Sequence, residues 1–435
     1  MSASIKSTVA SDAAANPWRD VFAAPLTDVG GDIAALIRDD REREQESLNM
    51  IASGSYSPFA MRQAEGSHLV NKNASGLPGR RSMANCQEAD RIEQLAIDRA
   101  RSVFGAQAAN VQALSSTLAN VAVFRAVMKA GDRLLSFDEL AGGHVSHGTS
   151  RHITSTGIEV RSFGVGADGR LDLAKARRIA LDYRPSVIVA GATSYPRAIE
   201  FGTLRRIADE VGALLFSDIA HVAGLVAVGL HENPVPFSDV ATTSTQKTLC
   251  GPRSGAFTFS RVEFAEAINQ AIYPGLQGPA PMQLIAARAV QLELVTRPYF
   301  RELMEAVLGN ARAMCEGLQN AGCSLYTGGT DTHMVLATTQ DADWDPAGLV
   351  EAFGCYGVTG NGMRVPNQAG DGADVAYRFG ATAMTIRGMD ETAFRTIGEL
   401  FGRIMARGPK AGVDEDIRAR VRSFALAFPV PSYVD

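Results

Sequence analysis

The sequence predicts an α/β fold, in which a large domain with a mostly parallel β-sheet precedes a smaller α+β domain at the C-terminus. Short apolar and β-branched runs alternate with helical stretches through the first two thirds of the chain, and beyond residue 290 long amphipathic helices surround fewer strands. The length of 435 residues also suits two unequal domains better than one. We expect an N-terminal arm and helix at 1–47, the large domain at 48–290 and the small domain at 291–435.

The first helices are predicted from charge and from apolar spacing. We expect helices at 27–51, 87–104 and 118–130, and a strand at 110–114. Ile92, Leu95 and Val103 recur at helical spacing, and Gly105 is a natural stop for their helix. A hydroxylic turn leads from the strand into the following helix, which Gly131 closes.

From residue 133 onward the pattern repeats as strand, loop and helix. Strands are expected at 133–137, 186–191, 213–217 and 255–259, with a helix at 203–211. This alternation is typical of a mostly parallel sheet with helices on both faces. In the C-terminal part we expect helices at 300–321 and 389–406 around strands near 333–338 and 375–380.

Composition argues against several classes of function. The net charge of -5 and the pI near 5.9 leave no basic footprint for nucleic acid. No apolar run approaches the roughly 18 residues that a membrane span needs, and the first residues lack the apolar region of a secretion signal. The five cysteines form no CxxC or Cys/His cluster, so neither a disulfide framework nor a zinc site is expected. A reducing cytoplasm fits best.

Polar residues stand where ligands bind in open parallel sheets, beyond the carboxyl ends of strands. Ser115-Ser116-Thr117 begins a helix, where hydroxyls, N–H groups and the helix dipole suit a phosphate, although the motif alone is better explained as a plain N-cap. Asp218 follows the strand 213–217. Its carboxylate could hold a protonated ring nitrogen, which turns a pyridine into an electron sink, or it could cap the next helix.

Two further segments carry candidate chemistry. Lys247 follows a hydroxylic strand end and precedes a Gly/Pro turn, so it could reach inward for Schiff-base formation or be an ordinary surface charge. In Gly142–Gly148, glycines flank His144 and His147, which suggests close backbone approach to a ligand and an imidazole free to stack or to carry protons. Two histidines could also bind a metal, but no carboxylate or cysteine nearby completes such a site.

The order and spacing of these residues resemble the active-site series of the serine hydroxymethyltransferases, which are fold-type-I enzymes that use pyridoxal 5'-phosphate. The series comprises Ser115–Thr117, His144, Asp218, His221, Lys247, Arg253 and Arg378. The resemblance runs from about Leu48 to the C-terminus and is clearest in Glu93–Ala100, Gly142–Gly148, Asp218–Ala227 and Lys247–Arg253. It implies an aspartate-aminotransferase-like large domain and an amino acid as the substrate.

The resemblance also implies a role for each residue. Lys247 would form the Schiff base with the cofactor, Asp218 would pair with its ring nitrogen, and His144 would stack on the ring. The phosphate would be held by Ser115, Ser116 and Thr117, and the phenolic oxygen would be approached by Thr193 and His221. The substrate would be contacted by Arg378, Ser53 and Arg253. The family forms dimers with shared active sites, and Tyr273–Gly278 matches the loop whose Gly278 would reach the partner's phosphate. We therefore expect a homodimer with catalytic residues Lys247, His144, Asp218 and His221.

The departures from the family pattern cluster around the substrate side chain. An acidic residue follows Ile-Ala-Ser in the family, but Gly54 follows Ser53 here. The family segment Glu-Gly-Tyr-Pro-Gly-Lys-Arg-Tyr-Tyr-Gly-Gly is replaced by 75–85, in which the active-site tyrosines become Leu77 and Met83. The histidine before the Schiff-base lysine is Gln246. Each lost proton-transfer group typically costs about 10²–10⁴-fold in rate, so ordinary folate-dependent serine–glycine interconversion is not expected.

We therefore predict a folate-independent enzyme of specialised metabolism that acts on a glycine-like or β-hydroxy amino acid through a quinonoid carbanion at Cα. Its outcome is aldol or transaldol exchange, or capture by O₂ with oxidative decarboxylation or deamination. The alternatives are a true folate-dependent hydroxymethyltransferase with replaced proton donors and an inactive subunit that binds the cofactor. Arg80 and Arg81 could bind an anionic side chain or merely solvate a loop.

Overall fold

Seven strands form the central sheet of the protein, whose computed structural model describes residues 18–339, 343–367 and 372–432. In sheet order these strands are β4 (Ala108–Asn110), β10 (Ala256–Ser260), β9 (Val240–Ser244), β8 (Leu214–Asp218), β7 (Val187–Gly191), β5 (Arg133–Phe137) and β6 (Glu159–Phe163). The strands from β9 to β6 run parallel, whereas β10 is antiparallel to both of its neighbours. The carboxyl ends of β7, β8 and β9 therefore meet at one edge of the sheet.

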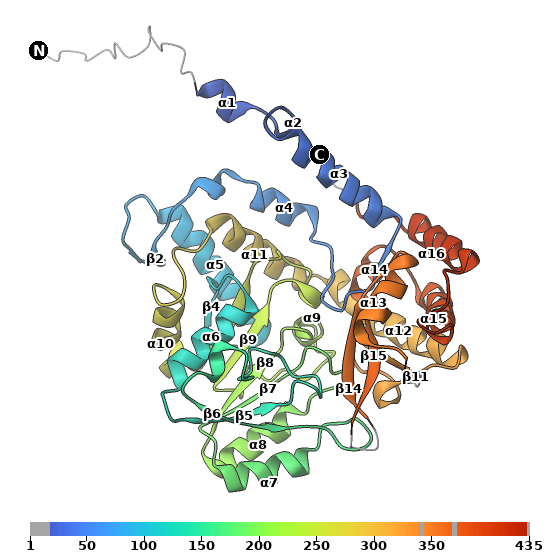
Figure 1. Ribbon diagram of the computed structural model, residues 1–435. Helices are drawn as coiled ribbons and strands as arrows, with labels where there is room; N and C mark the ends of the chain where they lie inside the picture. Colours follow the sequence, from blue (N-terminus) through green and yellow to red (C-terminus); the bar gives the residue numbers. More distant parts are fainter. Residues whose placement is uncertain (1–17, 340–342, 368–371, 433–435) are drawn as a thin grey trace, which may run out of the picture.

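Helices cover both faces of this sheet (Figure 1). They are α5 (Gln87–Phe104), α6 (Ser116–Val127), α7 (Leu173–Tyr183), α8 (Phe201–Val211), α9 (Ala223–Ala227), α10 (Val262–Ile272) and α11 (Met282–Val295), and α4 (Phe59–Glu65) packs on α11 outside them. Leu215 and Phe216 are consecutive in β8 but belong to different buried clusters, because successive side chains of a strand point to opposite faces. Burial on both faces explains why the central strands β7 and β8 are mainly apolar runs without polar alternation.

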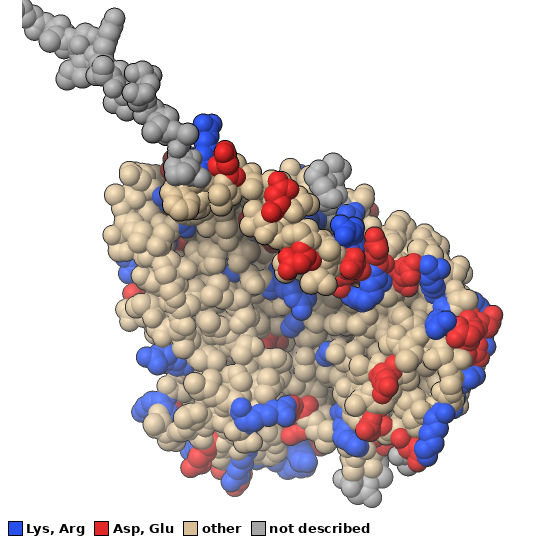
Figure 2. Space-filling model, turned by 45° about the horizontal axis from the view of Figure 1, so that its top comes forward, with Lys and Arg blue, Asp and Glu red and all other residues tan. Residues whose placement is uncertain are grey.

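A second, antiparallel sheet lies in the C-terminal part, in the order β11-β12-β15-β14. Its strands are β11 (Ser324–Leu325), β12 (Met334–Thr339), β15 (Ala373–Gly380) and β14 (Asn361–Pro366), and the accompanying helices are α12 (Pro298–Asn320), α13 (Pro346–Cys355), α14 (Thr382–Ile386), α15 (Glu391–Ala406) and α16 (Glu415–Ala427). A short pair, β1 (Leu48–Asn49) and β13 (Val358–Thr359), joins the start of the chain to this part. Figure 2 shows the surface hollowed between the two parts.

The N-terminal helices extend along the outside of the molecule (Figure 1). They are α1 (Arg19–Ala23), α2 (Leu26–Val29) and α3 (Gly31–Gln45), and none of their residues is buried. Several of their apolar side chains are largely exposed, including Phe22 at 87% and Leu36 at 63%. Arg387 ties the end of this arm to the C-terminal part by donating to backbone oxygens of Glu44 and Ser47.

The predicted α/β class with a smaller C-terminal α+β part is confirmed, while the domain boundaries at 47 and 290 stay predictions. The strand expected at 110–114 was placed wrongly, because β4 ends at Asn110. There the Asn110 side chain accepts a hydrogen bond from the Gln112 N–H, and this local turn takes the chain out of the ladder. The expected strands also omitted β6, whose exposed Glu159 and Arg161 disguise its strand pattern.

Candidate active site

Asp218 is the last residue of β8 and lies buried at the carboxyl edge of the large sheet. Oδ2 accepts hydrogen bonds from Asn120 Nδ2 at 2.8 Å and His147 Nε2 at 3.0 Å, and Oδ1 accepts one from the Ala220 N–H. Burial raises the pKa of the Asp218 carboxyl, but the hydrogen bond from His147 and the nearby positive charges outweigh it and hold the pKa below its usual value. Asp218 is therefore a buried anion, not the cap of the following helix.

The neighbours of Asp218 hold it in one orientation. Asn120 lies on α6, donates also to Ser146 Oγ at 2.9 Å and accepts from the Thr242 hydroxyl on β9 at 2.7 Å. On the other side, β7 ends in Gly191, where a Cβ would lie 2.4 Å from the Asp218 carbonyl oxygen. The carboxylate is thus fixed by packing and by three donors, which is what a preorganised charge requires.

Lys247 lies just after β9 and starts a turn of 3₁₀-helix, η3 (Lys247–Leu249), with a φ of 66°. Burial lowers the pKa of its ammonium group to about 8; the Asp218 carboxylate opposes this effect and the Arg378 guanidinium adds to it. Gln291 on α11 donates to the carbonyl oxygens of Thr245 and Leu249, on either side of the lysine, at 2.6 and 3.1 Å. The lysine is therefore a positioned, half-buried amine and not a solvated surface charge.

His144 lies in the loop after β5, within the Gly142–Gly148 segment. Its Nδ1 lies 2.7 Å from Ser146 Oγ, and burial, followed by the charge of His147, lowers its pKa to about 4. The glycines allow the tight path of this loop, because a Cβ at Gly143 would lie 2.2 Å from the Phe137 carbonyl oxygen. A neutral imidazole is thus presented beside Asp218.

Ser115 caps α6, since its hydroxyl oxygen accepts a hydrogen bond from the Leu118 N–H. Ser116 and Thr117 are the first residues of this helix, where backbone N–H groups are not used inside the helix. The plain N-cap interpretation and the anion-binding interpretation are compatible here, because capping by Ser115 leaves the following hydroxyls and the dipole available.

Arg378 reaches the large sheet from β15 of the C-terminal part. One of its terminal nitrogens donates to the Thr193 carbonyl oxygen at 2.5 Å and to Ser194 Oγ at 3.0 Å, and the other donates to Asn361 Oδ1 at 2.7 Å. Its Nε is buried and has no hydrogen-bond partner among the described residues. Burial lowers the pKa of this guanidinium to about 10, so Arg378 is a positioned cation with unused donor capacity.

His221 and Thr193 meet between the two parts of the chain. His221 Nε2 lies 3.1 Å from Thr193 Oγ1, and His221 Nδ1 lies 3.5 Å from Nε2 of His333. His333 Nε2 in turn lies 3.0 Å from the carbonyl oxygen of Ala52, which precedes Ser53. Ser53 is thereby placed near β15, because Gly380 packs against Ala52.

Four other residues singled out from the sequence have no described contact with Lys247, Asp218 or Arg378. Arg253 and Gly278 are exposed. Leu77 lies on a hairpin of β2 (Gly76–Leu77) and β3 (Arg80–Arg81), and Met83 follows it; β2 lies on the opposite side of the molecule from β14 and β15 (Figure 1). Within the part of the chain that the structure describes, no hydrogen bond or ion pair joins this hairpin to Lys247. Their predicted roles stay predictions.

The two arginines of the hairpin have different environments. Arg81 is almost fully buried and pairs with Glu93 at 2.6 Å and Asp90 at 2.8 Å. Arg80 is exposed and pairs with Glu266 at 3.0 Å. Both guanidinium groups are already occupied by carboxylates, which favours a structural role over binding of an anionic substrate.

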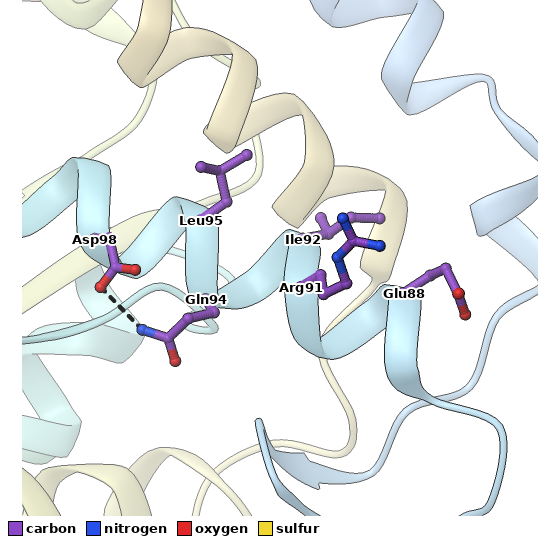
Figure 3. Close-up of a pocket in the computed structure, with 6 residues that line it drawn as sticks. All are labelled: Glu88, Arg91, Ile92, Gln94, Leu95 and Asp98. Carbon is purple, nitrogen blue, oxygen red and sulfur yellow. Dashed lines mark hydrogen bonds between the residues drawn. The ribbon is translucent and has the colours of Figure 1, made fainter.

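Two clefts differ in what they offer. One, of about 670 Å³, adjoins the group just described, since His144, Thr193 and Ser194 line it together with Met363 and Arg364. The other, of about 560 Å³, is a shallow groove on the outer face of α5 (Figure 3). Its lining residues are Glu88, Arg91, Ile92, Gln94, Leu95 and Asp98. None of these six is a predicted site residue, so the first cleft is the candidate entrance.

Sequence reasoning missed His147, Asn120 and His333 as site residues. Asn120 could have been noticed as a single amide in the otherwise apolar helix segment 118–124, and His147 lies in the glycine–histidine motif itself. His333 has no comparable local signal. In the described ranges no group of three or more His, Cys, Asp or Glu side chains could hold a metal ion, and no helix there is long and apolar enough to cross a membrane.

The donor set fits pyridoxal 5'-phosphate. A buried amine, a buried anionic carboxylate and a helix start bearing hydroxyls correspond to the aldehyde, ring nitrogen and phosphate of that group. The side-chain oxygen of Gln246, beside Lys247, is buried and lacks a hydrogen-bond partner in the described structure, as expected for a polar site built around a ligand.

Comparison with known proteins gives a consistent result. The sequence profile of the family named serine hydroxymethyltransferase matches residues 26–401. The chain is 40% identical to serine hydroxymethyltransferase 1 of Mycobacterium tuberculosis (strain CDC 1551 / Oshkosh), over 94% of this chain and 95% of the relative. It is 41% identical to serine hydroxymethyltransferase of Nocardia farcinica (94% and 95% covered) and 38% identical to that of Myxococcus xanthus (93% and 97% covered). The chain therefore belongs to the serine hydroxymethyltransferase family, whose fold-type-I enzymes use pyridoxal 5'-phosphate to convert amino acids.

Proposed function

We propose that this enzyme converts a glycine-like or β-hydroxy α-amino acid by a reaction at Cα that does not require folate. The observation that carries the proposal is that the half-buried amine of Lys247, just after β9, and the buried carboxylate of Asp218, at the end of β8, lie at the same edge of the sheet, where the Asp218 and Arg378 charges both act on the lysine. Because its pKa is lowered toward physiological pH, a larger fraction of this amine is neutral and able to attack an aldehyde than for an ordinary lysine, and the Arg378 cation can receive the carboxylate of an amino acid.

The chain's own residues would hold the cofactor as follows. Lys247 would bind its aldehyde carbon, Asp218 its ring nitrogen, and Ser115, Ser116 and Thr117 its phosphate. When bound, pyridoxal 5'-phosphate supplies an electron sink that stabilises negative charge at the substrate's α-carbon. Asp218 supports this chemistry because a carboxylate that stays ionised keeps a proton on the ring nitrogen.

Substrate orientation would fall to Arg378. Its two terminal nitrogens are held by Thr193, Ser194 and Asn361, so the guanidinium plane is fixed before the substrate arrives. The unpaired Nε and the fork geometry suit a carboxylate. A substrate held in this way has its α-carbon bonds oriented by the protein and not by diffusion.

The proposal of folate independence rests on Gly54, Leu77 and Met83, which replace groups that carry protons in the family. Without those groups the site favours reactions that need no base at a β-hydroxyl. One such outcome is oxidation by O₂: an amino acid, O₂ and water give a 2-oxo acid, ammonia and hydrogen peroxide. The competing outcome is aldol or transaldol exchange of the Cα–Cβ bond with an added aldehyde, which is the commoner reaction of this scaffold but does need the β-hydroxyl proton to be moved.

An amino-acid panel with and without O₂ tests this function. Consumption of a substrate with release of peroxide or CO₂ identifies the oxidative outcome, and aldehyde-dependent exchange identifies the aldol outcome. Turnover of L-serine that requires tetrahydrofolate would instead identify the second candidate, a true hydroxymethyltransferase, which 40% identity to proteins of that name favours. Cofactor binding without conversion of any amino acid would identify the third candidate, an inactive subunit. A cofactor spectrum that survives Lys247→Ala would overturn the assignment of the lysine.

We further propose a cytoplasmic homodimer with shared active sites. The N-terminal helices carry apolar side chains, Trp18, Phe22 and Leu36 among them, that are more than half exposed in the single chain. The groove on α5, where Leu95 is 45% exposed among polar side chains, is a second surface that a partner could cover (Figure 3). A second copy of the chain would cover such surfaces, and the exposed loop with Gly278 could then reach the partner's phosphate.

A further inference from the structure

His333 stands behind His221 in the buried core between the two parts of the chain. Both side chains are at most 4% exposed, and the two rings lie 5.6 Å apart and nearly parallel. His333 is 112 residues from His221 in sequence, and its only close acceptors in the described structure are the Ala52 carbonyl oxygen at 3.0 Å and His221 Nδ1 at 3.5 Å.

Both imidazoles are neutral, so each carries one ring proton. Burial, followed by the positive charges of Lys247 and Arg378, lowers the pKa of His221 well below its usual value. Burial lowers the pKa of His333 to about 3, although its hydrogen bond to the Ala52 carbonyl opposes this. The position of each single proton is then decided by the neighbouring atoms.

The Ala52 carbonyl oxygen determines which ring nitrogen of His333 carries the proton. A carbonyl oxygen only accepts, so His333 Nε2 must carry the hydrogen that it shares with Ala52. His333 Nε2, which carries this hydrogen, also lies 3.5 Å from His221 Nδ1. A second hydrogen on His221 Nδ1 would oppose it, so His221 must keep a lone pair at Nδ1 and carry its proton on Nε2.

The second proton then fixes the direction of the Thr193 hydroxyl. His221 Nε2–H donates to Thr193 Oγ1 at 3.1 Å, and a terminal nitrogen of Arg378 approaches the same oxygen at 3.5 Å. Both are donors, so Thr193 accepts from them and its own hydrogen must be donated elsewhere.

We propose that His333 is a positioning residue that holds His221 in the Nε2–H tautomer and thereby leaves the Thr193 hydroxyl free to donate to an anionic oxygen of the bound cofactor. The second half of this inference rests on the proposed function, in which Thr193 and His221 lie at the phenolic oxygen. The first half concerns only the protein. His333 itself touches neither cofactor nor substrate.

The ring protons can be read by ¹⁵N NMR of the full chain labelled at histidine, with His221 assigned from the signals lost in His221→Gln. We expect His221 and His333 to be protonated at Nε2 with bare Nδ1. In His333→Phe, which keeps the ring but removes the donor, His221 should show a mixture of tautomers. In His333→Gln, whose amide can still donate, the wild-type tautomer should be retained. His231→Phe, a histidine that packs on Phe201 outside the site, is the matched control and should change nothing.

A second readout is the dissociation constant of pyridoxal 5'-phosphate. In His333→Phe it should rise about 10-fold, which corresponds to the loss of roughly one net hydrogen bond. In His333→Gln it should stay near the wild-type value. Nδ1 protonation of His221 in the wild type, or an unchanged tautomer in His333→Phe, would overturn the inference. If His333→Phe does not fold, the wild-type tautomers alone decide. The histidine tautomers are measured without added cofactor. A wrong tautomer would therefore refute this inference alone, whereas a failure of Lys247 to bind the cofactor would refute the proposed function.

Discussion

Nε2 of His147 lies 3.0 Å from Oδ2 of Asp218, and both side chains are buried at the carboxyl end of β8. The histidine is a donor in this contact, so it favours the ionised form of the carboxylate, which burial alone would disfavour. The pair therefore maintains a fixed negative charge where a ring nitrogen would need one.

Asp218→Asn should lower kcat about 1,000-fold, because a preorganised charge at the reacting group is lost while its size is kept. Steady-state kinetics on the preferred amino acid measures this. Asp331→Asn, which removes a half-exposed carboxylate paired with Arg197, is the matched control and should leave kcat nearly unchanged. Equal losses in the two variants would contradict the role of Asp218.

Lys247→Met should stabilise the cofactor-free chain at neutral pH. The pKa of the buried ammonium falls from 10.5 to about 8, so its burial in charged form costs about 3 kcal/mol below pH 8. As pH rises from about 8 toward 10.5, the folded amine is already neutral and this cost disappears. Urea unfolding at pH 7 and pH 10 should show the gain only at pH 7. A similar gain in the exposed-site variant Lys175→Met would refute the explanation.

Arg378→Lys should raise KM about 100-fold, because an ammonium cannot replace the planar fork that receives a carboxylate. The effect should be smaller on kcat than on KM if the guanidinium mainly binds the substrate. Arg197→Lys alters another arginine, which bridges to Asp331 in the same region, and should change KM little. If Arg378→Lys left KM unchanged, the substrate carboxylate would have to be bound by another residue.

If the proposed homodimer uses α3, Ile33→Glu combined with Ile37→Glu should convert it into monomers, because these side chains are 49% and 57% exposed in the single chain and an apolar partner would cover them. Sedimentation velocity measures the mass. Arg38→Glu places a carboxylate on the same helix at a position that is already charged, and it should leave the dimer intact. A double variant that remains dimeric would place the interface on another surface.

Arg81→Met should lower the free energy of unfolding by about 3 kcal/mol or more, since it leaves the buried Glu93 carboxylate without its cation. Arg80→Met removes the neighbouring arginine, whose exposed ion pair with Glu266 is screened by water, and it should have little effect on stability. Urea unfolding of the two variants is the comparison. If Arg80→Met were as destabilising as Arg81→Met, burial would not be the deciding factor.

Much of the secondary structure follows from local pattern. The helix 87–104 and the strand 133–137 were predicted with the bounds that the structure has, because apolar spacing and a terminal glycine act within a few residues. The end of β4 was predicted wrongly because a single side chain, Asn110, captures a backbone N–H that the strand pattern assigns to the ladder. Local competition of this kind does not alter hydrophobic periodicity.

The sequence by itself determined the α/β class, the order of polar residues at the strand ends and the candidate pair Lys247 and Asp218, because these depend on short-range periodicity and on residue chemistry. Only the tertiary structure decided that His147 and Asn120 fix the carboxylate, that Arg81 is buried and Arg80 is not, and that His333 faces His221. The contacts of His147, Asn120 and His333 join segments far apart in the chain, and even Arg81 meets Glu93 only because the hairpin lies against α5. Their partners are set by how strands and helices pack in three dimensions, and no local pattern encodes that packing.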